Sequence, residues 1–389
     1  MISLDQLELT GKRVFVRVDF NVPLKGATVT DATRIDAALP TIRYAIEHGA
    51  RVILASHLGR PKGKVDSAFS LAPVRAVLEA KLGQPVGLAP DCIGPAVEQQ
   101  VAALGNGQVL LLENLRFHTA EEKNEPGFAA ALARLADVYV NDAFGTAHRA
   151  HASTAGMVPL VATRAAGFLL QRECDFLGRI LAAPERPLVA ILGGAKVSDK
   201  IKVIESLLGR VDSLLIGGAM AYTFLRAQGL STGTSLVEEA QIGLAGGLLT
   251  TAQARGVRLL LPVDHVVAPS ADSASDAVTV RTIPADKMGL DIGAETVAAF
   301  RAVIAEARTV FWNGPLGMFE VAPFDAGTMA VAAAVADSRA VSVIGGGDSV
   351  AAIMRSGRSN DITHISTGGG ASLEFLEGVA LPGLVALES

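Results

Sequence analysis

The sequence predicts an α/β protein of two domains, each a parallel β-sheet covered by helices. At 389 residues the chain exceeds the usual size of a single domain. Hydrophobic residues make up 50% of it and charged residues 19%, which is enough apolar material for large buried cores. Short β-rich runs alternate with segments of helical spacing along the chain, a pattern typical of parallel sheets with helices on both faces.

The first half of the chain contains four β-rich apolar runs, most of which end in a polar residue or glycine. The runs cover residues 14–21, 51–59, 109–117 and 137–145. Between them, apolar residues at helical spacing predict helices in segments that include 31–49 and 71–83.

The same alternation resumes in the second half. Its β-rich runs cover residues 188–194, 213–220, 258–268, 309–317, 341–347 and 364–370. Between the two series, residues 163–187 have helical spacing and end near Pro184 and Pro187. Because proline stops a helix, this segment is predicted to be a helix that links the domains.

Charge and composition restrict the compartment and the partners. The formal net charge is −5, whereas nucleic-acid and membrane-surface binders usually carry a basic excess. The first residues include Asp5 and Glu8 and do not resemble a secretory signal. The only cysteines, Cys92 and Cys174, lie far apart and have no metal-binding spacing. We therefore expect a cytoplasmic protein that binds neither nucleic acid nor membranes, and nothing requires a disulfide.

Four strands of the second half are expected to end in glycines. These are Gly193–Gly194, Gly217–Gly218, Gly345–Gly347 and Gly368–Gly370. Any one pair can simply tighten a strand-to-helix turn. Glycines also let backbone N–H groups approach an anion at a helix N-terminus, and four such turns on one sheet, with lysines among them, favour a polyphosphate ligand.

The stretch "ILGGAKVSDK" (191–200) holds two lysines next to the first glycine pair. It does not match a Walker A loop, and the chain has no dinucleotide-binding G-x-G-x-x-G, so a nucleotide site here must be of another design. If a helix begins near Ser198, Lys196 lies in the turn and Lys200 in the first helical turn. Both ammonium groups can then reach the same polyphosphate.

Asp348 follows a glycine run at the expected start of a helix. Two interpretations are open at this point. The carboxylate can cap the helix, or it can hold the Mg²⁺ that bridges nucleotide phosphates.

Polar and cationic residues gather at the strand ends of the first half. They are Asp19, Asn21, Arg34, His57, Arg60, Arg116, His148, Arg149 and His151. A single arginine is usually a surface charge, but several that converge can bind phosphate or carboxylate bidentately. His148 and His151 also form an H-x-x-H, although no third metal ligand follows at a recognisable spacing. No nucleophile motif is present, so electrostatic rather than covalent chemistry is indicated.

Together these motifs resemble the phosphoglycerate kinase family. The matching segments, in family order, are 13–24, 55–63, 111–124, 139–153, 191–201, 214–225, 311–320, 344–350 and 366–378. The departures are small: Ala219 stands where many members have glycine, and Ser349 where many have threonine.

The resemblance implies two Rossmann-like domains joined by a linker helix with a hinge cleft, in a monomer. It implies an N-terminal 3-phosphoglycerate-binding domain over residues 1–165 and a linker helix over 166–185. A C-terminal nucleotide-binding domain is implied over 186–375, followed by a tail over 376–389 that returns to the N-terminal domain.

The resemblance also assigns site residues. The 3-phosphoglycerate site is implied at Asp19, Phe20, Asn21, Arg34, His57, Leu58, Gly59, Arg60, Arg116 and Arg149. Contacts to MgADP or MgATP are implied for Lys200, Gly289, Glu320, Gly346, Gly347, Asp348 and Ser349, with Asp348 as the metal-associated carboxylate. Arg34, Lys196 and Lys200 are implied to be catalytic.

The implied reaction is reversible, Mg²⁺-dependent phosphoryl transfer between 1,3-bisphosphoglycerate and ADP, which gives 3-phosphoglycerate and ATP. The attacking oxygen is anionic in both directions, so no general base is needed, and domain closure with charge stabilisation would suffice. The alternative is a catalytically silent nucleotide-binding scaffold of the same fold. The presence of Arg34, Lys196 and Asp348 argues against it.

Overall fold

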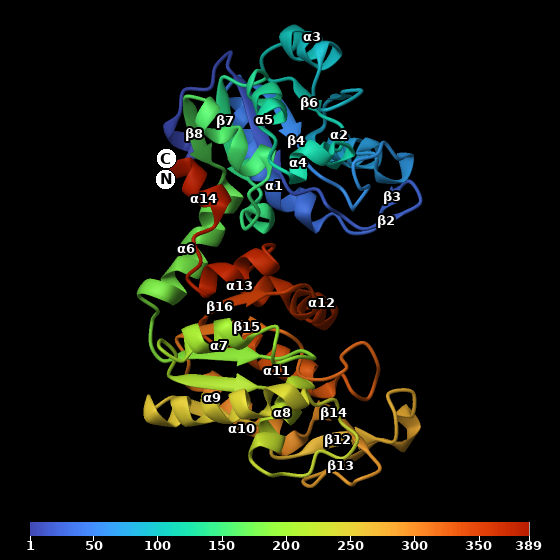
Figure 1. Cartoon of the computed structure of the whole chain (residues 1–389), viewed down its shortest axis with the longest axis vertical. Coiled ribbons are helices and arrows are strands. Elements are labelled where there is room, and N and C mark those ends of the chain that lie inside the picture. Colours follow the sequence, from blue (N-terminus) through green and yellow to red (C-terminus); the bar gives the residue numbers. More distant parts are fainter. Residues whose placement is uncertain (389) are drawn as a thin grey trace. The chain divides into compact units, whose positions relative to one another are not determined.

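The computed structural model describes residues 1–388 and divides the chain into two compact units (Figure 1). Unit 1 is Met1–Asp175 together with the chain from Ala380 onward, and unit 2 is Phe176–Val379. The boundary falls within helix α6 (Phe168–Ala182). Each unit is built on a parallel sheet with helices packed against it, which confirms the predicted fold class.

Unit 1 contains a six-stranded sheet in the order β5-β6-β4-β1-β7-β8. Every pairing in it is parallel. Val16 at the centre lies opposite Leu54 on one side and Val140 on the other. The strands are β1 (Arg13–Val18), β4 (Arg51–Ala55), β5 (Val86–Leu88), β6 (Val109–Leu111), β7 (Val138–Asp142) and β8 (Thr163–Ala166), and a small hairpin is formed by β2 (Leu24–Lys25) and β3 (Thr28–Val29).

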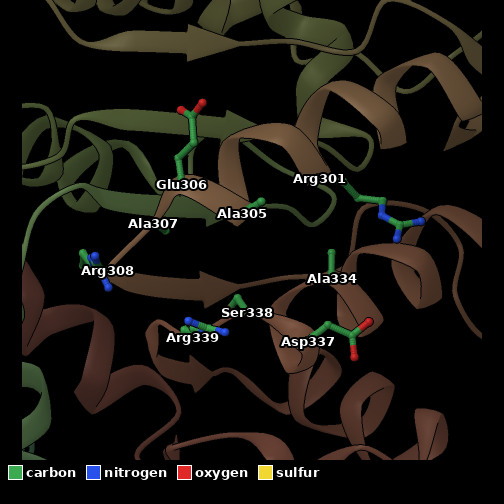
Figure 2. Close-up of a pocket in the computed structure, with 9 residues that line it drawn as sticks. All are labelled: Arg301, Ala305, Glu306, Ala307, Arg308, Ala334, Asp337, Ser338 and Arg339. Atoms are coloured by element: carbon green, nitrogen blue, oxygen red, sulfur yellow. The ribbon is translucent and has the colours of Figure 1, made fainter.

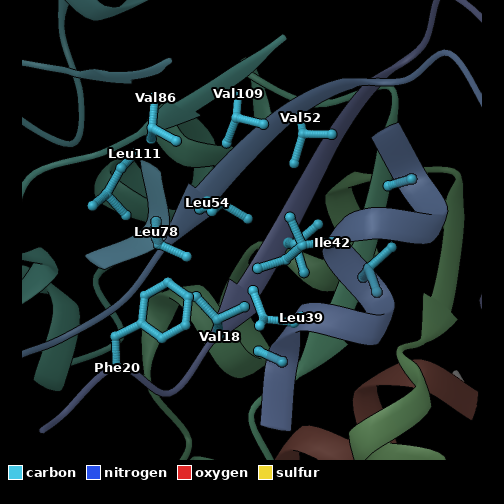
Figure 3. Close-up of a cluster of buried hydrophobic side chains, with 14 of the residues drawn as sticks. Val18, Phe20, Leu39, Ile42, Val52, Leu54, Leu78, Val86, Val109 and Leu111 are labelled. Carbon is cyan, nitrogen blue, oxygen red and sulfur yellow. The ribbon is translucent and has the colours of Figure 1, made fainter. Parts of the chain in front are cut away.

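The helices of unit 1 bury their apolar stripes against this sheet. Helix α1 places Leu39 and Ile42, three residues apart, on the face that packs against the strands, where Val18 and Leu54 lie (Figure 3). The helices are α1 (Thr33–Glu47), α2 (Ala72–Leu82), α3 (Pro95–Ala103), α4 (Thr119–Glu122), α5 (Pro126–Ala133), α14 (Pro382–Glu388) and the start of α6.

Unit 2 contains a second six-stranded parallel sheet, in the order β11-β10-β9-β15-β16-β17. Its strands are β9 (Leu188–Leu192), β10 (Ser213–Ile216), β11 (Arg258–Leu260), β15 (Thr309–Asn313), β16 (Val341–Gly345) and β17 (His364–Ile365). A separate antiparallel sheet, which the sequence did not predict, contains β12 (His265–Ala268), β13 (Val278–Val280) and β14 (Met288–Ile292).

The helices of unit 2 surround a core in which Trp312 is fully buried. Phe300 and Ile304 belong to the same buried cluster as Trp312. The helices are α7 (Ile201–Leu207), α8 (Met220–Ala227), α9 (Ile242–Ala254), α10 (Ala294–Glu306), α11 (Ala326–Asp337), α12 (Gly347–Ser356) and α13 (Gly370–Leu376).

Two predicted elements differ from the structure. The run 258–268 was expected to be one strand, but it is divided between β11 and β12, because Pro262 lies between them and cannot donate a ladder hydrogen bond. The linker helix begins only at Phe168, since residues 163–166 form edge strand β8. Asp142 fixes this start by accepting the N–H groups of Leu169 and Leu170 at 2.9 and 3.2 Å.

The order of the strands determines where each sheet can bind a ligand. In unit 1 the chain leaves β1 toward β4 and later returns to β7 on the other side of β1; in unit 2 it leaves β9 toward β10 and returns to β15. Open parallel sheets bind ligands at the carboxyl ends of the strands that flank such a reversal. The expected positions are therefore the loops after β1 in unit 1 and after β9 and β15 in unit 2.

Within residues 1–388, no helix combines the length and the apolar character that crossing a membrane requires. Cys92 and Cys174 are both free thiols.

We expect Ile304→Ala to lower the free energy of unfolding by about 2 to 5 kcal/mol, because it leaves a cavity in the core around Trp312. Urea unfolding followed by the fluorescence of Trp312, the only tryptophan, measures the change. The control is Met354→Ala on the surface of α12, where the side chain is 50% exposed and an effect within about 0.5 kcal/mol is expected. Equal midpoints for the two variants would contradict the assignment of Ile304 to the core.

Candidate active site

A group of polar and cationic residues lies where the central strands of unit 1 end, and we call it the cationic site. Its members come from the loops after β1 and β4, from α1, from the short helix at Leu115–Phe117 and from the loop after β7. They are Asp19, Asn21, Arg34, His57, Gly59, Arg60, Arg116 and Arg149. The structure thus brings together residues that span more than a hundred positions in sequence.

Direct contacts join most of the cationic site. Arg34 Nη1 lies 2.7 Å from Asp19 Oδ2, which turns the guanidinium toward the strand end. Asn21 Oδ1 accepts the N–H of Gly59 at 2.8 Å, and Arg116 Nη1 donates to the Gly59 carbonyl at 3.0 Å. The loop after β4 is therefore held from both sides.

Phe20 and Leu58 lie beside the cationic site, but their side chains belong to the hydrophobic core of unit 1 (Figure 3 shows Phe20). Only their backbones can face a ligand. Arg60, by contrast, is exposed and forms no ion pair or hydrogen bond through its side chain with any of residues 1–388. Arg149 is half-buried, and its Nε lies 3.2 Å from His148 Nε2.

Burial and neighbouring cations keep His57 and the nearby His151 neutral near pH 7. Burial, followed by the charges of Arg17 and Arg116, lowers the pKa of His57 well below its ordinary value. The pKa of His151 is lowered to about 4, mainly by burial and then by Arg116. The positive charge of this site near pH 7 therefore comes from arginines.

Arg17 is a member of this region that the motif analysis missed. It lies within β1, is fully buried, and donates from Nε to Ser153 Oγ at 2.8 Å. Ser153 is in turn held by the buried carboxyl group of Glu121. The signal in the sequence is a charged residue inside the apolar run "VFVRVDF", since an arginine in a buried strand requires partners.

In unit 2 the glycine turns are less open to an anion than the sequence suggested. Gly193 and Gly194 donate their N–H groups to the carbonyls of Asn313 and Pro315 at 3.0 and 2.9 Å. Gly217 and Gly218 likewise donate to Leu192 and Leu316, each at 2.9 Å. These turns pack directly on the loop after β15, and a Cβ at Gly193 would overlap the Pro315 carbonyl. Their glycines thus serve close backbone packing.

The turn after β16 differs, because it leads directly into α12. Gly346 has a φ of +90°, which favours glycine, and the first helical hydrogen bond runs from the Val350 N–H to the Gly346 carbonyl at 3.0 Å. The N–H groups of Gly347, Asp348 and Ser349 therefore lie in the first turn, where an α-helix leaves its donors without intrahelical partners.

Asp348 does not cap α12, which corrects one of the two sequence-based interpretations. The N-cap is Gly346, and Asp348 is the second residue of the helix. Its exposed carboxylate makes no hydrogen bond or ion pair with residues 1–388. One free carboxylate beside an open helix N-terminus fits Mg²⁺, which takes its other ligands from phosphates and water.

The two lysines both precede α7, whereas Lys200 was expected in its first turn. The helix begins at Ile201 because residues 198–200 form a turn, in which Lys200 N–H donates to the Val197 carbonyl at 2.8 Å. Lys200 is buried and its Nζ donates to Asn313 Oδ1. Burial lowers its pKa to about 8. Lys196 is exposed.

Asn313 is a second residue that the sequence analysis missed. It ends β15, and its Nδ2 is buried without a hydrogen-bond partner among residues 1–388. Such an orphan donor is costly unless a ligand or water meets it. The signal in the sequence is the polar residue that closes the buried run "TVFWN".

The remaining residues with implied nucleotide contacts lie in different surroundings. Gly289, in β14, donates its N–H to Ser235 Oγ at 2.8 Å and lies so close to the Tyr222 ring that a side chain would overlap it. Glu320 is exposed. The Ser349 hydroxyl is buried and accepts the N–H of Gly314 at 2.5 Å, so it joins the turn after β15 to α12.

A cavity of about 680 Å³ lies at the opposite, amino edge of the unit 2 sheet (Figure 2). Arg301, Arg308 and Arg339 line it, but α10 and α11 also end there. The negative ends of these helices attract arginines without any ligand, and the cavity holds none of the predicted site residues. We assign it no part in the function.

Comparison with known proteins agrees with this geometry. The family profile described as "Phosphoglycerate kinase" matches residues 4–379. Proteins named phosphoglycerate kinase from Solibacter usitatus and Moorella thermoacetica are 60% and 61% identical to the chain. The alignments cover 100% and 99% of this chain and 99% and 98% of those proteins.

A solved structure of phosphoglycerate kinase from Coxiella burnetii superimposes with a TM-score of 0.90 at 43% identity and covers 100% of this chain and 98% of its own. A structure from Pyrococcus horikoshii gives a TM-score of 0.83 at 35% identity. Sequence and fold therefore agree over the full length, and the chain belongs to the phosphoglycerate kinase family.

Proposed function

We propose that the two units of this chain divide the substrates of the phosphoglycerate kinase reaction between them. The chain catalyses reversible, Mg²⁺-dependent phosphoryl transfer between 1,3-bisphosphoglycerate and ADP, giving 3-phosphoglycerate and ATP. A silent scaffold of the same fold is not favoured.

The cationic site of unit 1 binds 3-phosphoglycerate in this proposal. The ligand carries a carboxylate and a phosphate, and arginines bind both groups bidentately. Arg34 and Arg116 are oriented by Asp19 and Gly59, which reduces the entropy lost on binding. This convergence of oriented arginines at a strand reversal is the observation that carries the assignment.

Unit 2 binds the nucleotide. The first-turn N–H groups of α12 and the ammonium groups of Lys196 and Lys200 supply positive charge to the phosphates, and Asn313 Nδ2 supplies a neutral donor. We assign contacts with the rest of the nucleotide to Gly289 and Glu320, as the family resemblance implies. Asp348 would hold Mg²⁺, which neutralises phosphate charge when bound.

Arg34, Lys196 and Lys200 act by charge stabilisation. The attacking group, a carboxylate or a phosphate oxygen, is already anionic and needs no base, so catalysis consists of positioning the reactants and stabilising the transferring group. Transfer requires the two ligands to meet, and exclusion of water then prevents hydrolysis.

The proposal also covers the localisation, the oligomeric state and the partners of the protein. We infer a cytoplasmic monomer with small-molecule substrates that binds neither nucleic acid nor membranes, consistent with the net charge of −5. We also infer that the chain from Ala380 onward belongs functionally with unit 1.

The proposed function is tested by incubating the protein with MgATP and 3-phosphoglycerate in hydroxylamine, which traps acyl phosphate as hydroxamate. We expect hydroxamate only when both substrates are present. A folded protein that binds MgATP but yields no hydroxamate would be the silent scaffold instead.

Lys196→Ala is expected to lower kcat more than tenfold while the fold persists, because an exposed ammonium group that faces the transferring phosphoryl group is lost. The matched control is Lys202→Ala, which removes another exposed lysine nearby, from α7. Steady-state kinetics and circular dichroism measure activity and folding. An unchanged kcat in Lys196→Ala removes this residue from the catalytic role.

Affinity for MgADP should fall as pH rises through about 8, because the lowered pKa of Lys200 means that the free enzyme loses this ammonium charge there. Between pH 7 and 9.5 we expect the Kd to rise about tenfold, as for loss of one charge-assisted hydrogen bond. Calorimetric titration measures it. Lys200→Arg keeps its charge over this range and should flatten the profile; a flat profile in the unmodified protein contradicts the role of Lys200.

A further inference from the structure

A buried hydrogen-bonded chain connects the interior of unit 1 to the cationic site. It runs from Glu121 in α4 through Ser153 to Arg17 in β1 and ends at His57, after β4. The first three residues are fully buried and His57 is 4% exposed. Burial of so many polar groups is costly unless each is satisfied, so their donors and acceptors can be assigned.

The assignment begins at Glu121. Its carboxyl group accepts hydrogen bonds from the Ser153 N–H at 2.9 Å and from the Ser153 hydroxyl at 2.5 Å. These two bonds fix the position of Ser153 Oγ. Arg17 Nε then donates to that oxygen at 2.8 Å, and Nη1 donates to the carbonyl of Val18. With these two directions fixed, Nη2 faces His57 Nδ1 at 3.3 Å.

A guanidinium group in a protein is always protonated and only donates. Nδ1 of His57 must therefore accept, which leaves the single proton of a neutral ring on Nε2. That nitrogen makes no hydrogen bond with residues 1–388 and is not among the buried polar atoms that lack partners, so it is open to a ligand.

We propose that Arg17, held by Ser153 and Glu121, is a positioning residue that fixes His57 as the neutral Nε2–H tautomer, so that His57 donates a hydrogen bond to an oxygen of 3-phosphoglycerate. The donation to substrate rests on the proposed function of the cationic site. The assignment of the His57 tautomer rests only on the contacts of Arg17 and does not depend on that function.

The other groups that face His57 support this state. Burial lowers the pKa of His57 most, and the positive charges of Arg17, Arg116 and Arg34 lower it further. His151 also faces His57, but it is neutral near pH 7. Asp19 Oδ1 is 4.0 Å from Nδ1 and does not offset them. His57 is therefore neutral near pH 7, and its donation to substrate does not depend on pH in the physiological range.

The test is NMR of the protein with ¹⁵N-labelled imidazoles, with His57 assigned from the spectrum of His57→Gln. In the unmodified protein we expect Nδ1 unprotonated and Nε2 protonated from pH 5.5 to 8.5, and a shift of the Nε2–H signal when 3-phosphoglycerate is added. The variant that combines Arg17→Met with Glu121→Gln leaves no unpaired buried charge. In this variant we expect both tautomers of His57 and a His57 pKa that moves toward the ordinary value of about 6.5. We also expect the KM for 3-phosphoglycerate to rise at least tenfold while kcat changes less than threefold.

Arg34→Met is the matched control. It removes a positive charge from the same site but leaves the Arg17 contact to Nδ1, so the tautomer should be unchanged. A protonated Nδ1 of His57 in the unmodified protein would overturn the proposal, and so would an unchanged tautomer in the double variant. If the double variant does not fold, the protonation of Nδ1 in the unmodified protein decides the test. A fixed tautomer whose Nε2–H signal ignores 3-phosphoglycerate would overturn the donation to substrate, whether or not the hydroxamate assay shows activity.

Discussion

The parallel alignment of strands is the constraint on which both units depend. In each large sheet all strands run in one direction, so the residues that follow them meet at a single edge. Reversal of the chain about β1 in unit 1 and β9 in unit 2 opens that edge to a ligand. The fold therefore supplies one ligand-binding edge in each unit, and the residues at that edge decide which ligand it binds.

In unit 1 those residues are cations, and the structure limits how freely they can move. Asp19 and the loop at Gly59 hold arginines by short contacts, and Arg17 is enclosed in the protein interior. A buried guanidinium does not add stability by itself, because its desolvation offsets the attraction of its partners. Its effect lies in geometry, since a guanidinium group in which each of the three nitrogens has a partner has one orientation, and it transmits this orientation to its neighbour.

Unit 2 achieves a positive environment in a different way. Two of its glycine turns, Gly193–Gly194 and Gly217–Gly218, donate their N–H groups to backbone carbonyls at the ends of β9 and β15 and in the loop after β15. The first-turn N–H groups of α12 stay open, and Lys200 lies against Asn313. A buried lysine with a lowered pKa and an unpartnered amide nearby mark a place where a polyanion would satisfy groups that the protein leaves unsatisfied.

The sequence by itself determined the fold class, the family and most members of the cationic site, because alternating apolar runs and long motifs are local features that can be recognised in the sequence alone. It did not reveal that the turns at Gly193 and Gly217 commit their N–H donors to distant carbonyls, that Lys200 lies against Asn313, or that Arg17 reaches His57. Each of these depends on which distant backbone or side chain fills the space around a residue. Only the tertiary structure decides that, since hydrogen-bond partners 40 or more positions apart leave no periodic pattern in the chain.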